Sequence, residues 1–377
     1  MGQDAKHRQL DIIELTEQLI AIPSISGNET EILRFVASWM QSADFDNVIA
    51  EKRFTAGLIR AGKQPAQRAL ILCGHVDTVS PGDESAWQQS PWQPRIADDR
   101  LYGLGTSDMK AGVALQIIAA AEYANNRRDD LDVWCVVVAN EEVDGAGSAD
   151  FTQYFSTETQ YQEASCAIAE PTDNRIEIGH RGNQFVELLF ERKSGHASQE
   201  TAYQESSLPA VMSFLNDLPN IRQQFHNIYR HDILGEPSFT PTRIAPEGSY
   251  SNNKTAGTSC IAIDIRTTPP LDANFDDWIN KLTATYDCAW RYSANPVRSA
   301  LCDANAKILT TMQKLLPQAE TTVSYGATDQ AFFQAIGVQT IIYGPGDFSQ
   351  AHTVDESVSI TRIKEVYDIY QKLIREI

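Results

Sequence analysis

The chain has 377 residues, more than a single hydrophobic core usually supports, so two domains are expected. Its hydrophobic fraction of 42% and charged fraction of 21% are those of an ordinary globular protein and exclude a largely disordered chain. The formal net charge of −19 at pH 7 disfavours nucleic acid and membrane surfaces as partners, because both are negatively charged.

Six cysteines are spread along the chain without a C-x-x-C pair, and several lie in apolar runs. Buried thiols in a reducing compartment are the simplest interpretation. The amino terminus shows no signal-peptide pattern, and no apolar run approaches the length that spans a membrane. We therefore expect a soluble, cytoplasmic protein.

The first part of the chain alternates helical and strand-like patterns. Apolar residues at helical spacing predict a helix over 9–22, and a second one follows over about 29–42. Nearly continuous apolar runs predict strands buried on both faces, at 57–60, 69–73, 133–139 and 166–169. Further helices are expected at 109–125 and about 147–155. This order predicts α/β architecture with a central mixed sheet.

The pattern changes from about residue 174. Residues 176–192 alternate apolar and polar side chains, as in a strand with one buried face. The elements expected next are a helix, two strands, a helix and a strand, at about 206–218, 238–246, 258–267, 273–286 and 288–293. This β-α-β-β-α-β order is that of ferredoxin-like domains and predicts an inserted α+β domain.

The first pattern then returns. A helix is expected within 303–316, a strand at 339–343 and a closing helix at about 360–375. We therefore predict one domain formed by residues 1–173 and 294–377, interrupted by a second domain of residues 174–293.

Histidine and acidic side chains stand just after several predicted strands, where α/β sheets open the crevice that binds ligands. They are His75 and Asp77, Glu141 and Glu142, Glu170 and, late in the chain, His352. Each one has an ordinary structural explanation, such as a solvated surface charge. Six such residues at successive strand ends together indicate a functional site.

Two of these pairs have spacings with a chemical meaning. Residues two apart on an extended segment point the same way, so Asp77 could contact one ring nitrogen of His75 while the other binds a metal. A histidine that is merely hydrogen-bonded at a sheet edge is the common alternative. Adjacent Glu141 and Glu142 point in different directions, so one can bind a metal while the other transfers protons.

Asp108 follows a G-x-G pattern and stands at the start of the predicted helix over 109–125, where an N-cap aspartate is common. A nucleotide-binding loop is the rival interpretation. Asp108 replaces the third glycine of such a loop, its charge would face a pyrophosphate, and no buried strand leads directly into the motif. A nucleotide-dependent oxidoreductase is therefore disfavoured.

Two histidines with carboxylates, and no cysteine ligand, suit zinc or another borderline divalent ion. A pair of ions that share one carboxylate would polarise a carbonyl and lower the pKa of a bridging water to near neutrality. The pattern therefore predicts metal-dependent hydrolysis with two divalent ions per subunit, zinc first, with cobalt and manganese as alternatives.

The chain resembles the family of acetylornithine deacetylases, succinyl-diaminopimelate desuccinylases, aminoacylases and carboxypeptidases over nearly its whole length. The resemblance rests, in order and spacing, on His75-x-Asp77, Gly105-Thr106-Ser107-Asp108-Met109-Lys110, Glu141-Glu142, Glu170-Pro171-Thr172, Gly195-His196-Ala197-Ser198 and Gln350-Ala351-His352. It implies an exopeptidase-like two-metal catalytic domain. By position, the implied metal ligands are the bridging Asp108, His75 and Glu170 in one site, and Glu142 and His352 in the other.

The resemblance also implies further roles. Glu141 would be the general base, and Asp77 would orient His75. The inserted domain would form a homodimer and act as a lid, and His196 would cross to the partner's active site to stabilise the oxyanion of the transition state.

Four residues match candidate substrate contacts. Arg266 would bind the substrate carboxylate, for which a planar guanidinium is suited, although a strand-face ion pair explains it equally well. Asn253 matches the family's asparagine 13 residues earlier. Arg181 lies in His180-Arg181-Gly182, which resembles the acetylornithine deacetylases, and Thr328 lies in the segment 324–329, where Ala327 replaces a glycine common in the desuccinylases.

Glu rather than Asp at position 170 fits the deacylase branch of the family. The segment 343–352 is most similar to acetylornithine and acetylcitrulline deacetylases. We therefore expect hydrolysis of N2-acetyl-L-ornithine to ornithine and acetate, as in arginine biosynthesis; acetylcitrulline, succinyl-diaminopimelate and dipeptides are alternatives. A non-catalytic ligand-binding protein is the alternative from another class, but it need not keep Glu141 and both metal sets.

Overall fold

The computed structural model describes residues 11–248, 251–324 and 326–377. It divides into two compact units. The main unit comprises Met1–Gly179, Leu301–Thr322 and Thr328–Ile377, and the inserted unit comprises His180–Ala300 and Val323–Ala327. The boundaries predicted for the inserted domain, 174 and 293, thus lie a few residues before the observed boundaries, His180 and Ala300. The reason is that β8 (Ile176–His180) and β13 (Ala300–Leu301), at the two junctions, both pair within the large sheet of the main unit.

A nine-stranded sheet forms the centre of the main unit, in the order β1-β2-β6-β3-β7-β15-β8-β13, with β14 paired to β8. The remaining strands are β1 (Asn47–Ala50), β2 (Phe54–Ile59), β3 (Arg68–His75), β6 (Leu131–Val138), β7 (Glu163–Pro171), β14 (Thr321–Ser324) and β15 (Gln339–Gly344). Strands β6, β3, β7 and β15 run parallel, whereas β1, β2 and β8 pair antiparallel. The sheet is therefore mixed, as predicted. The central strands β3 and β6 are buried along almost their whole length, which explains their continuous apolar sequence.

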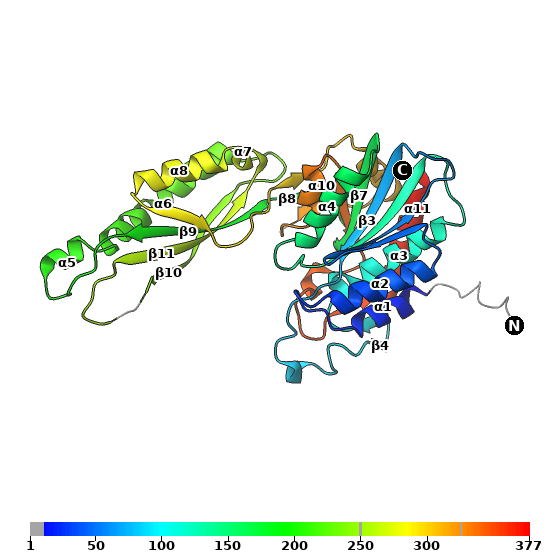
Figure 1. The fold of residues 1–377 in the computed structure, drawn as a ribbon, viewed down its shortest axis with the longest axis horizontal. Helices are drawn as coiled ribbons and strands as arrows, with labels where there is room; N and C mark the ends of the chain where they lie inside the picture. Colours follow the sequence, from blue (N-terminus) through cyan, green and yellow to red (C-terminus); the bar gives the residue numbers. More distant parts are fainter. Residues whose placement is uncertain (1–10, 249–250, 325) are drawn as a thin grey trace. The chain divides into compact units, whose positions relative to one another are not determined.

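Helices cover both faces of this sheet (Figure 1). They are α1 (Ile12–Ile20), α2 (Thr30–Ser42), α3 (Ala111–Tyr123), α4 (Ala146–Glu158), α9 (Lys307–Leu315), α10 (Gln330–Ala335) and α11 (Ile360–Glu376). Figure 1 shows α4 and α10 on the opposite side of the sheet from α1, α2 and α3. Helix α3 is buried on nearly all sides because it packs against the sheet and against both α1 and α11. The predicted helices are confirmed, except that residues 9 and 10 of the first lie outside the described residues.

A small three-stranded sheet joins two distant segments of the main unit. It consists of β4 (Arg95–Ala97), β5 (Arg100–Tyr102) and β16 (Ser357–Ser359), in the order β16-β5-β4. Strand β5 leads directly into the G-x-G motif, but only its middle residue, Leu101, is buried, so it is not a buried strand of the kind that precedes a nucleotide-binding loop. Short 3-10 helices lie at Glu84–Ala86 and Phe348–Gln350, and Thr106–Lys110 form a tight turn before α3 in which Asp108 and Met109 have non-helical backbone angles.

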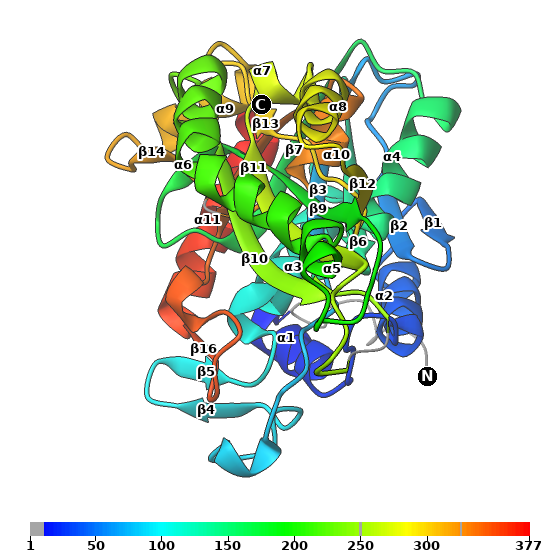
Figure 2. The same cartoon turned by 90° about the vertical axis from the view of Figure 1, so that its left-hand side faces the viewer.

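The inserted unit contains a four-stranded antiparallel sheet in the order β10-β11-β9-β12 (Figure 2). Its elements are β9 (Gly182–Glu191), α5 (Glu200–Gln204), α6 (Leu208–Tyr229), β10 (Ser238–Pro246), β11 (Thr258–Thr267), α7 (Pro269–Asp272), α8 (Phe275–Thr285) and β12 (Ala289–Tyr292). Helices α6 and α8 cover one face, and aromatic side chains such as Phe214 and Phe239 fill the space between. The predicted ferredoxin-like order is confirmed. Helix α6 is longer than the predicted 206–218, because it continues through Pro219.

The six cysteines are all free; Cys288 is half-buried and the other five are buried. This confirms the expectation of buried thiols. Among the described residues, no helix combines the length and apolar character needed to cross a membrane.

Candidate active site

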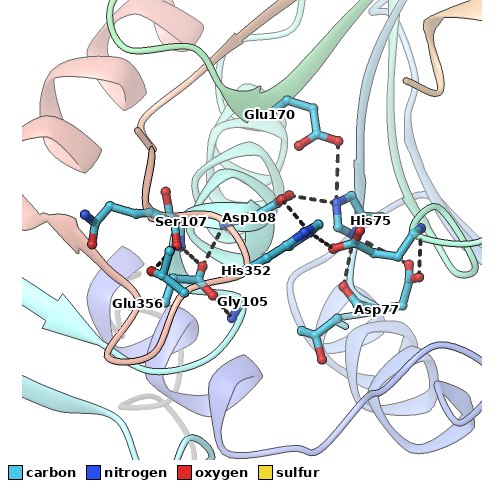
Figure 3. A network of polar contacts seen from close by, with 12 residues as sticks. His75, Asp77, Gly105, Ser107, Asp108, Glu170, His352 and Glu356 are labelled. Atoms are coloured by element: carbon cyan, nitrogen blue, oxygen red, sulfur yellow. Dashed lines mark hydrogen bonds and ion pairs between the residues drawn. The ribbon is translucent and has the colours of Figure 1, made fainter. Parts of the chain in front are cut away.

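The predicted residues of the main unit meet where parallel strands end (Figure 3). His75 is the last residue of β3, Glu170 is the penultimate residue of β7, and Glu141 and Glu142 lie in the turn just after β6. Parallel strands end at the same edge of a sheet, so side chains far apart in the sequence come together there. Asp108 lies in the turn before α3.

The first group of ligand atoms contains His75, Asp108 and Glu170. His75 Nε2 lies 3.1 Å from Asp108 Oδ1 and 3.5 Å from Glu170 Oε1. His75 Nδ1 donates a hydrogen bond of 3.0 Å to the backbone carbonyl of Asp77. Because a carbonyl oxygen can only accept, Nδ1 carries a proton, and Nε2 is the ring nitrogen that faces the two carboxylates and can bind a metal once it has lost its proton.

The second group contains Asp108, Glu142 and His352. His352 Nε2 lies 2.9 Å from Glu142 Oε1 and 3.5 Å from Asp108 Oδ2. In each group, the candidate ligand atoms all lie within 4.8 Å of one another. Asp108 belongs to both groups and offers a different oxygen to each. Imidazole nitrogens and carboxylate oxygens in this arrangement fit two neighbouring divalent ions of the zinc type.

The charges of the two groups shift the pKa values of their members. Burial lowers the pKa of His75, but Glu170, Asp108 and Asp77 raise it by more, to well above its ordinary value. The hydrogen bond that His352 donates to Glu142 raises the pKa of His352 to about 9. Burial and the charge of Asp108 raise the pKa of Glu170 to about 8. Crowded carboxylates of this kind repel one another unless a cation lies between them.

Asp77 contacts other parts of the site besides His75, the partner predicted for it. Its Oδ1 lies 3.5 Å from His75 Nδ1, longer than a hydrogen bond. The same carboxylate accepts hydrogen bonds from the backbone N–H groups of Glu141 (3.1 Å) and Glu142 (3.2 Å) and from the Ser26 hydroxyl (2.8 Å). Asp77 thus fixes the turn that carries both glutamates.

Glu141 belongs to neither ligand group. Burial raises its pKa well above the ordinary value; Glu170, Asp329 and Glu142 add to the rise, and His75 opposes it. A carboxyl group whose pKa is raised can accept a proton and release it again near neutral pH. Glu141 therefore differs from its neighbour Glu142: Glu142 belongs to a ligand group, whereas Glu141 lies outside both groups and has a pKa suited to proton transfer.

Two buried residues of the site were missed by the sequence analysis. The carboxylate of Glu356 accepts hydrogen bonds from three backbone N–H groups of the turn that carries Asp108. Burial and the charge of Asp108 raise its pKa to about 8, while the three N–H groups lower it. Lys110 is completely buried, and its Nζ donates to the backbone carbonyls of Leu19 (3.0 Å) and Ile22 (3.3 Å) near the end of α1. The available signals were the place of Lys110 in the matched motif 105–110 and the spacing of Glu356 four residues after His352.

Two of the other predicted residues lie together in the inserted unit. His196 is exposed, and its Nδ1 lies 2.7 Å from the Ser198 hydroxyl. The backbone carbonyl of Asn253 accepts a hydrogen bond of 2.8 Å from Ala197 N–H. The segments that contain His196 and Asn253, although far apart in the sequence, therefore lie side by side and are joined by a backbone hydrogen bond.

Arg266 forms a two-pronged ion pair with Asp264 in the inserted unit, with N–O distances of 2.9 and 3.0 Å. The strand-face ion pair considered from the sequence is therefore present. The charge of Arg266 contributes to a lowered pKa of Arg181, whose main cause is burial. Arg181 Nη1 donates to the carbonyl of Glu236 (2.8 Å). Thr328 lies in the main unit, where its hydroxyl accepts from Gln330 N–H (3.3 Å).

A third group of possible ligands, Glu187, Glu247 and Cys260, lies in the inserted unit. Glu187 forms ion pairs with Arg243 (2.9 Å) and Arg291 (2.6 Å), and Glu247 pairs with Arg291. Arginine charges neutralise these carboxylates, so a metal ion has little to gain there.

Comparison with known proteins identifies relatives over the whole chain. Residues 71–376 match the model of Peptidase family M20/M25/M40. Acetylornithine deacetylase from Proteus mirabilis (strain HI4320) is 28% identical over 378 residues, covering 96% of this chain and 95% of the relative.

Solved structures with the same fold include the M20 family metallo-carboxypeptidase Sso-CP2 from Sulfolobus solfataricus, with a TM-score of 0.72, 16% identity and coverage of 97% of this chain and 99% of that one. The YXEP protein of Bacillus subtilis, described as a dinuclear metal binding peptidase, has a TM-score of 0.68, 13% identity and coverage of 97% and 98%. The chain belongs to Peptidase family M20/M25/M40 and is a metal-dependent amidohydrolase.

Proposed function

We propose that this protein hydrolyses the amide bond of an N-acyl amino acid with the help of two divalent ions, and that N2-acetyl-L-ornithine is its substrate. The observation that carries the proposal is the pair of ligand groups that share Asp108, with Glu141 beside them and outside both. Zinc is the proposed ion because histidine and carboxylate ligands without cysteine suit it; cobalt and manganese share this preference in part.

The residues that would hold the ions are His75, Asp108 and Glu170 on one side, and Asp108, Glu142 and His352 on the other. When bound, the ions supply positive charge that polarises the amide carbonyl and acidifies the attacking water. Asp77 holds the backbone of Glu141 and Glu142, so that the two neighbouring glutamates keep their separate positions.

Glu141 is the proposed general base. It takes one proton from the attacking water as the new carbon–oxygen bond forms, and it returns that proton to the amide nitrogen as the carbon–nitrogen bond breaks. The second proton of the water also passes to the amine, so the products are a carboxylate and a protonated amine, and atoms and charge balance.

The inserted unit is proposed as a dimerisation and lid domain. His196, from the second copy of a homodimer, would donate a hydrogen bond to the developing oxyanion. Arg266, Arg181, Asn253 and Thr328 are the proposed substrate contacts. For Arg266 this role requires that the substrate carboxylate compete with, or add to, the ion pair with Asp264.

Acetylornithine is favoured because the curated relatives at 26–28% identity are named acetylornithine deacetylase. Acetylcitrulline, succinyl-diaminopimelate and dipeptides remain the rival substrates, the last because solved structures of the same fold are named peptidases. The deciding experiment is a comparison of kcat/KM for acetylornithine, acetylcitrulline, acetyllysine, succinyl-diaminopimelate and a dipeptide, each with added zinc and with a chelator. Preference for the succinylated substrate or the dipeptide would contradict the substrate assignment and leave the chemistry intact.

The general base is tested by Glu141→Gln, which keeps the shape of the side chain and removes its basicity. We expect a loss of kcat of about 10²–10⁴-fold, as for other general bases, with zinc content unchanged. Glu158→Gln, at an exposed position at the end of α4, is the control and should retain full activity. Near wild-type hydrolysis by Glu141→Gln would exclude the proposed role.

A further inference from the structure

The turn that carries Asp108 has the form of an anion-binding loop. The backbone N–H groups of Gly105, Ser107 and Asp108 all point at one place, where Figure 3 shows the carboxylate of Glu356. Successive N–H groups that converge in this way bind anions in many proteins, and phosphate is a frequent one. In this chain the bound anion is an internal carboxylate, that of Glu356.

The contacts of Glu356 with this turn are short and buried. Its Oε2 accepts from Gly105 N–H at 2.8 Å, and its Oε1 accepts from Ser107 N–H at 2.7 Å and Asp108 N–H at 3.0 Å. Its backbone carbonyl also accepts from Gly103 N–H at 3.0 Å. The side chain is 1% exposed, so water does not compete for these hydrogen bonds.

The position of Glu356 is fixed independently of the turn. Glu356 directly precedes β16, which pairs with β5 in register Ser357 to Tyr102, and β5 leads into the turn. The segment that contains Glu356 is therefore joined to the segment of β5 and its turn in two ways. Strand β16 pairs with β5, and the Glu356 carboxylate accepts hydrogen bonds from the turn that follows β5. The last of the three N–H groups belongs to Asp108 itself.

We infer that Glu356 is a positioning residue for the metal site: its carboxylate holds the backbone of Gly105, Ser107 and Asp108 so that the Asp108 side chain reaches both ligand groups. The inference rests on the proposed function, in which Asp108 bridges the two ions. It also assigns the G-x-G motif a role other than nucleotide binding, since the motif's N–H groups are already satisfied within the chain.

Glu356→Gln tests this inference with little change of shape. The amide oxygen can still accept two of the three hydrogen bonds, but the amide NH₂ then faces an N–H donor. We expect the zinc affinity of the metal-depleted protein, measured by competition with a chromogenic chelator, to fall about 10–100-fold, as for other residues that orient metal ligands. The measurement is made where circular dichroism shows each variant to be folded.

Asp132→Asn is the matched control. Asp132 is also a buried carboxylate, and it accepts from Ala61 N–H (2.7 Å), but it lies at the beginning of β6, at the other end of that strand from Glu141. This variant should lower the unfolding temperature and leave zinc affinity within about twofold of wild type, since it touches no residue of the proposed site. If both variants changed zinc affinity equally, the effect of Glu356 would be general destabilisation and the inference would be wrong.

Asp108→Asn separates this inference from the proposed function. Loss of zinc binding in Asp108→Asn together with wild-type affinity in Glu356→Gln would overturn the role of Glu356 alone. Unchanged zinc binding in Asp108→Asn would overturn the metal site itself. If Glu356→Gln does not fold, Glu356→Asp, which keeps the charge on a side chain shorter by one methylene, is measured against the same criteria.

Discussion

Asp77 is completely buried, and both of its carboxylate oxygens accept hydrogen bonds from the turn that follows β6. Its pKa is lowered: burial opposes the shift, but His75, the Ser26 hydroxyl and the backbone of Glu141 favour the charged form by more. An ionised carboxylate at this position can hold several donors at once, because it has acceptor sites on both oxygens.

Replacing this charge with an amide tests the role of Asp77. In Asp77→Asn, one oxygen becomes an NH₂ group that faces an N–H or O–H donor, so we expect the free energy of unfolding to fall by about 1–3 kcal/mol. We expect kcat/KM to fall about 10–100-fold, because the turn with Glu141 is no longer fixed. Urea denaturation and steady-state kinetics measure the two effects.

Ser26→Ala is the control for this substitution. It removes a single hydrogen bond to Asp77 and should cost only about 1 kcal/mol, with a small effect on activity. Equal losses of activity in the two variants would show that the contacts of Asp77 with the glutamate turn do not matter.

The candidate metal ligands predicted from the sequence lie together in the structure, whereas the predicted substrate contact Arg266 is paired with a neighbouring side chain. His75, Asp108, Glu142, Glu170 and His352 lie in two groups in the main unit, in the two sets that the family resemblance implied. Arg266, in contrast, is paired with Asp264 two residues away. A motif can predict that an arginine faces one side of a strand, but the pairing depends on which side chains share that face.

At the scale of elements, the turn between β5 and α3 requires glycine at position 105. Its φ is +78°, and a Cβ there would lie 2.7 Å from Thr78 Cγ2. Both the left-handed backbone conformation and the lack of space oppose any other residue.

Gly105→Ala should therefore destabilise the protein by more than the backbone effect alone. Gly337 provides the comparison, since its φ of +80° is almost the same and nothing lies within 4 Å of its Cβ position. We expect Gly337→Ala to cost about 1–2 kcal/mol and Gly105→Ala to cost about 1–3 kcal/mol more, measured by urea denaturation. Equal costs would mean that the turn moves freely to accept a side chain.

Most elements of the fold were predictable because hydrophobic periodicity records which faces are buried. Strands β10 and β11 have the bounds expected from the sequence. The short strands β4, β5 and β16 were missed, since three residues are too few to show an alternating pattern. These strands matter because they place Glu356 beside the G-x-G turn.

At the scale of the whole molecule, several buried groups in the metal-free protein hold protons that the unfolded chain would release. The pKa is raised to about 8 for Glu170, to about 7 for Asp329 and to about 9 for His352, with burial as the main cause in the carboxyl groups and the hydrogen bond to Glu142 in the histidine. Where the folded state binds more protons than the unfolded state, stability falls as pH rises.

We therefore expect the free energy of unfolding of the metal-free protein to be highest near the ordinary carboxyl pKa values of about 4 and to fall as pH rises toward about 9. Urea denaturation with chelator at a series of pH values measures this slope. Asp329→Asn removes one of the titrating groups and should flatten the decline below the pKa of about 7. Stability that rose with pH over this range would contradict the expectation.

Zinc should reverse this dependence. Bound cations favour deprotonated ligands, and ligand binding stabilises the folded state by about 2.7 kcal/mol when the free ion is at 100 times its Kd. The stabilisation by zinc should thus grow with pH, which the same denaturation series with zinc in place of chelator measures.

The sequence by itself determined the two-unit organisation, the order of the larger elements and the set of residues at strand ends, because periodicity and residue type are local properties. Only the tertiary structure decided that Asp77 joins Ser26 to the glutamate turn and that Glu356 fills the turn before α3. The donors in these contacts are largely backbone N–H groups, which every residue except proline has. Their partners lie up to 251 residues away, so no pattern of side chains reveals them.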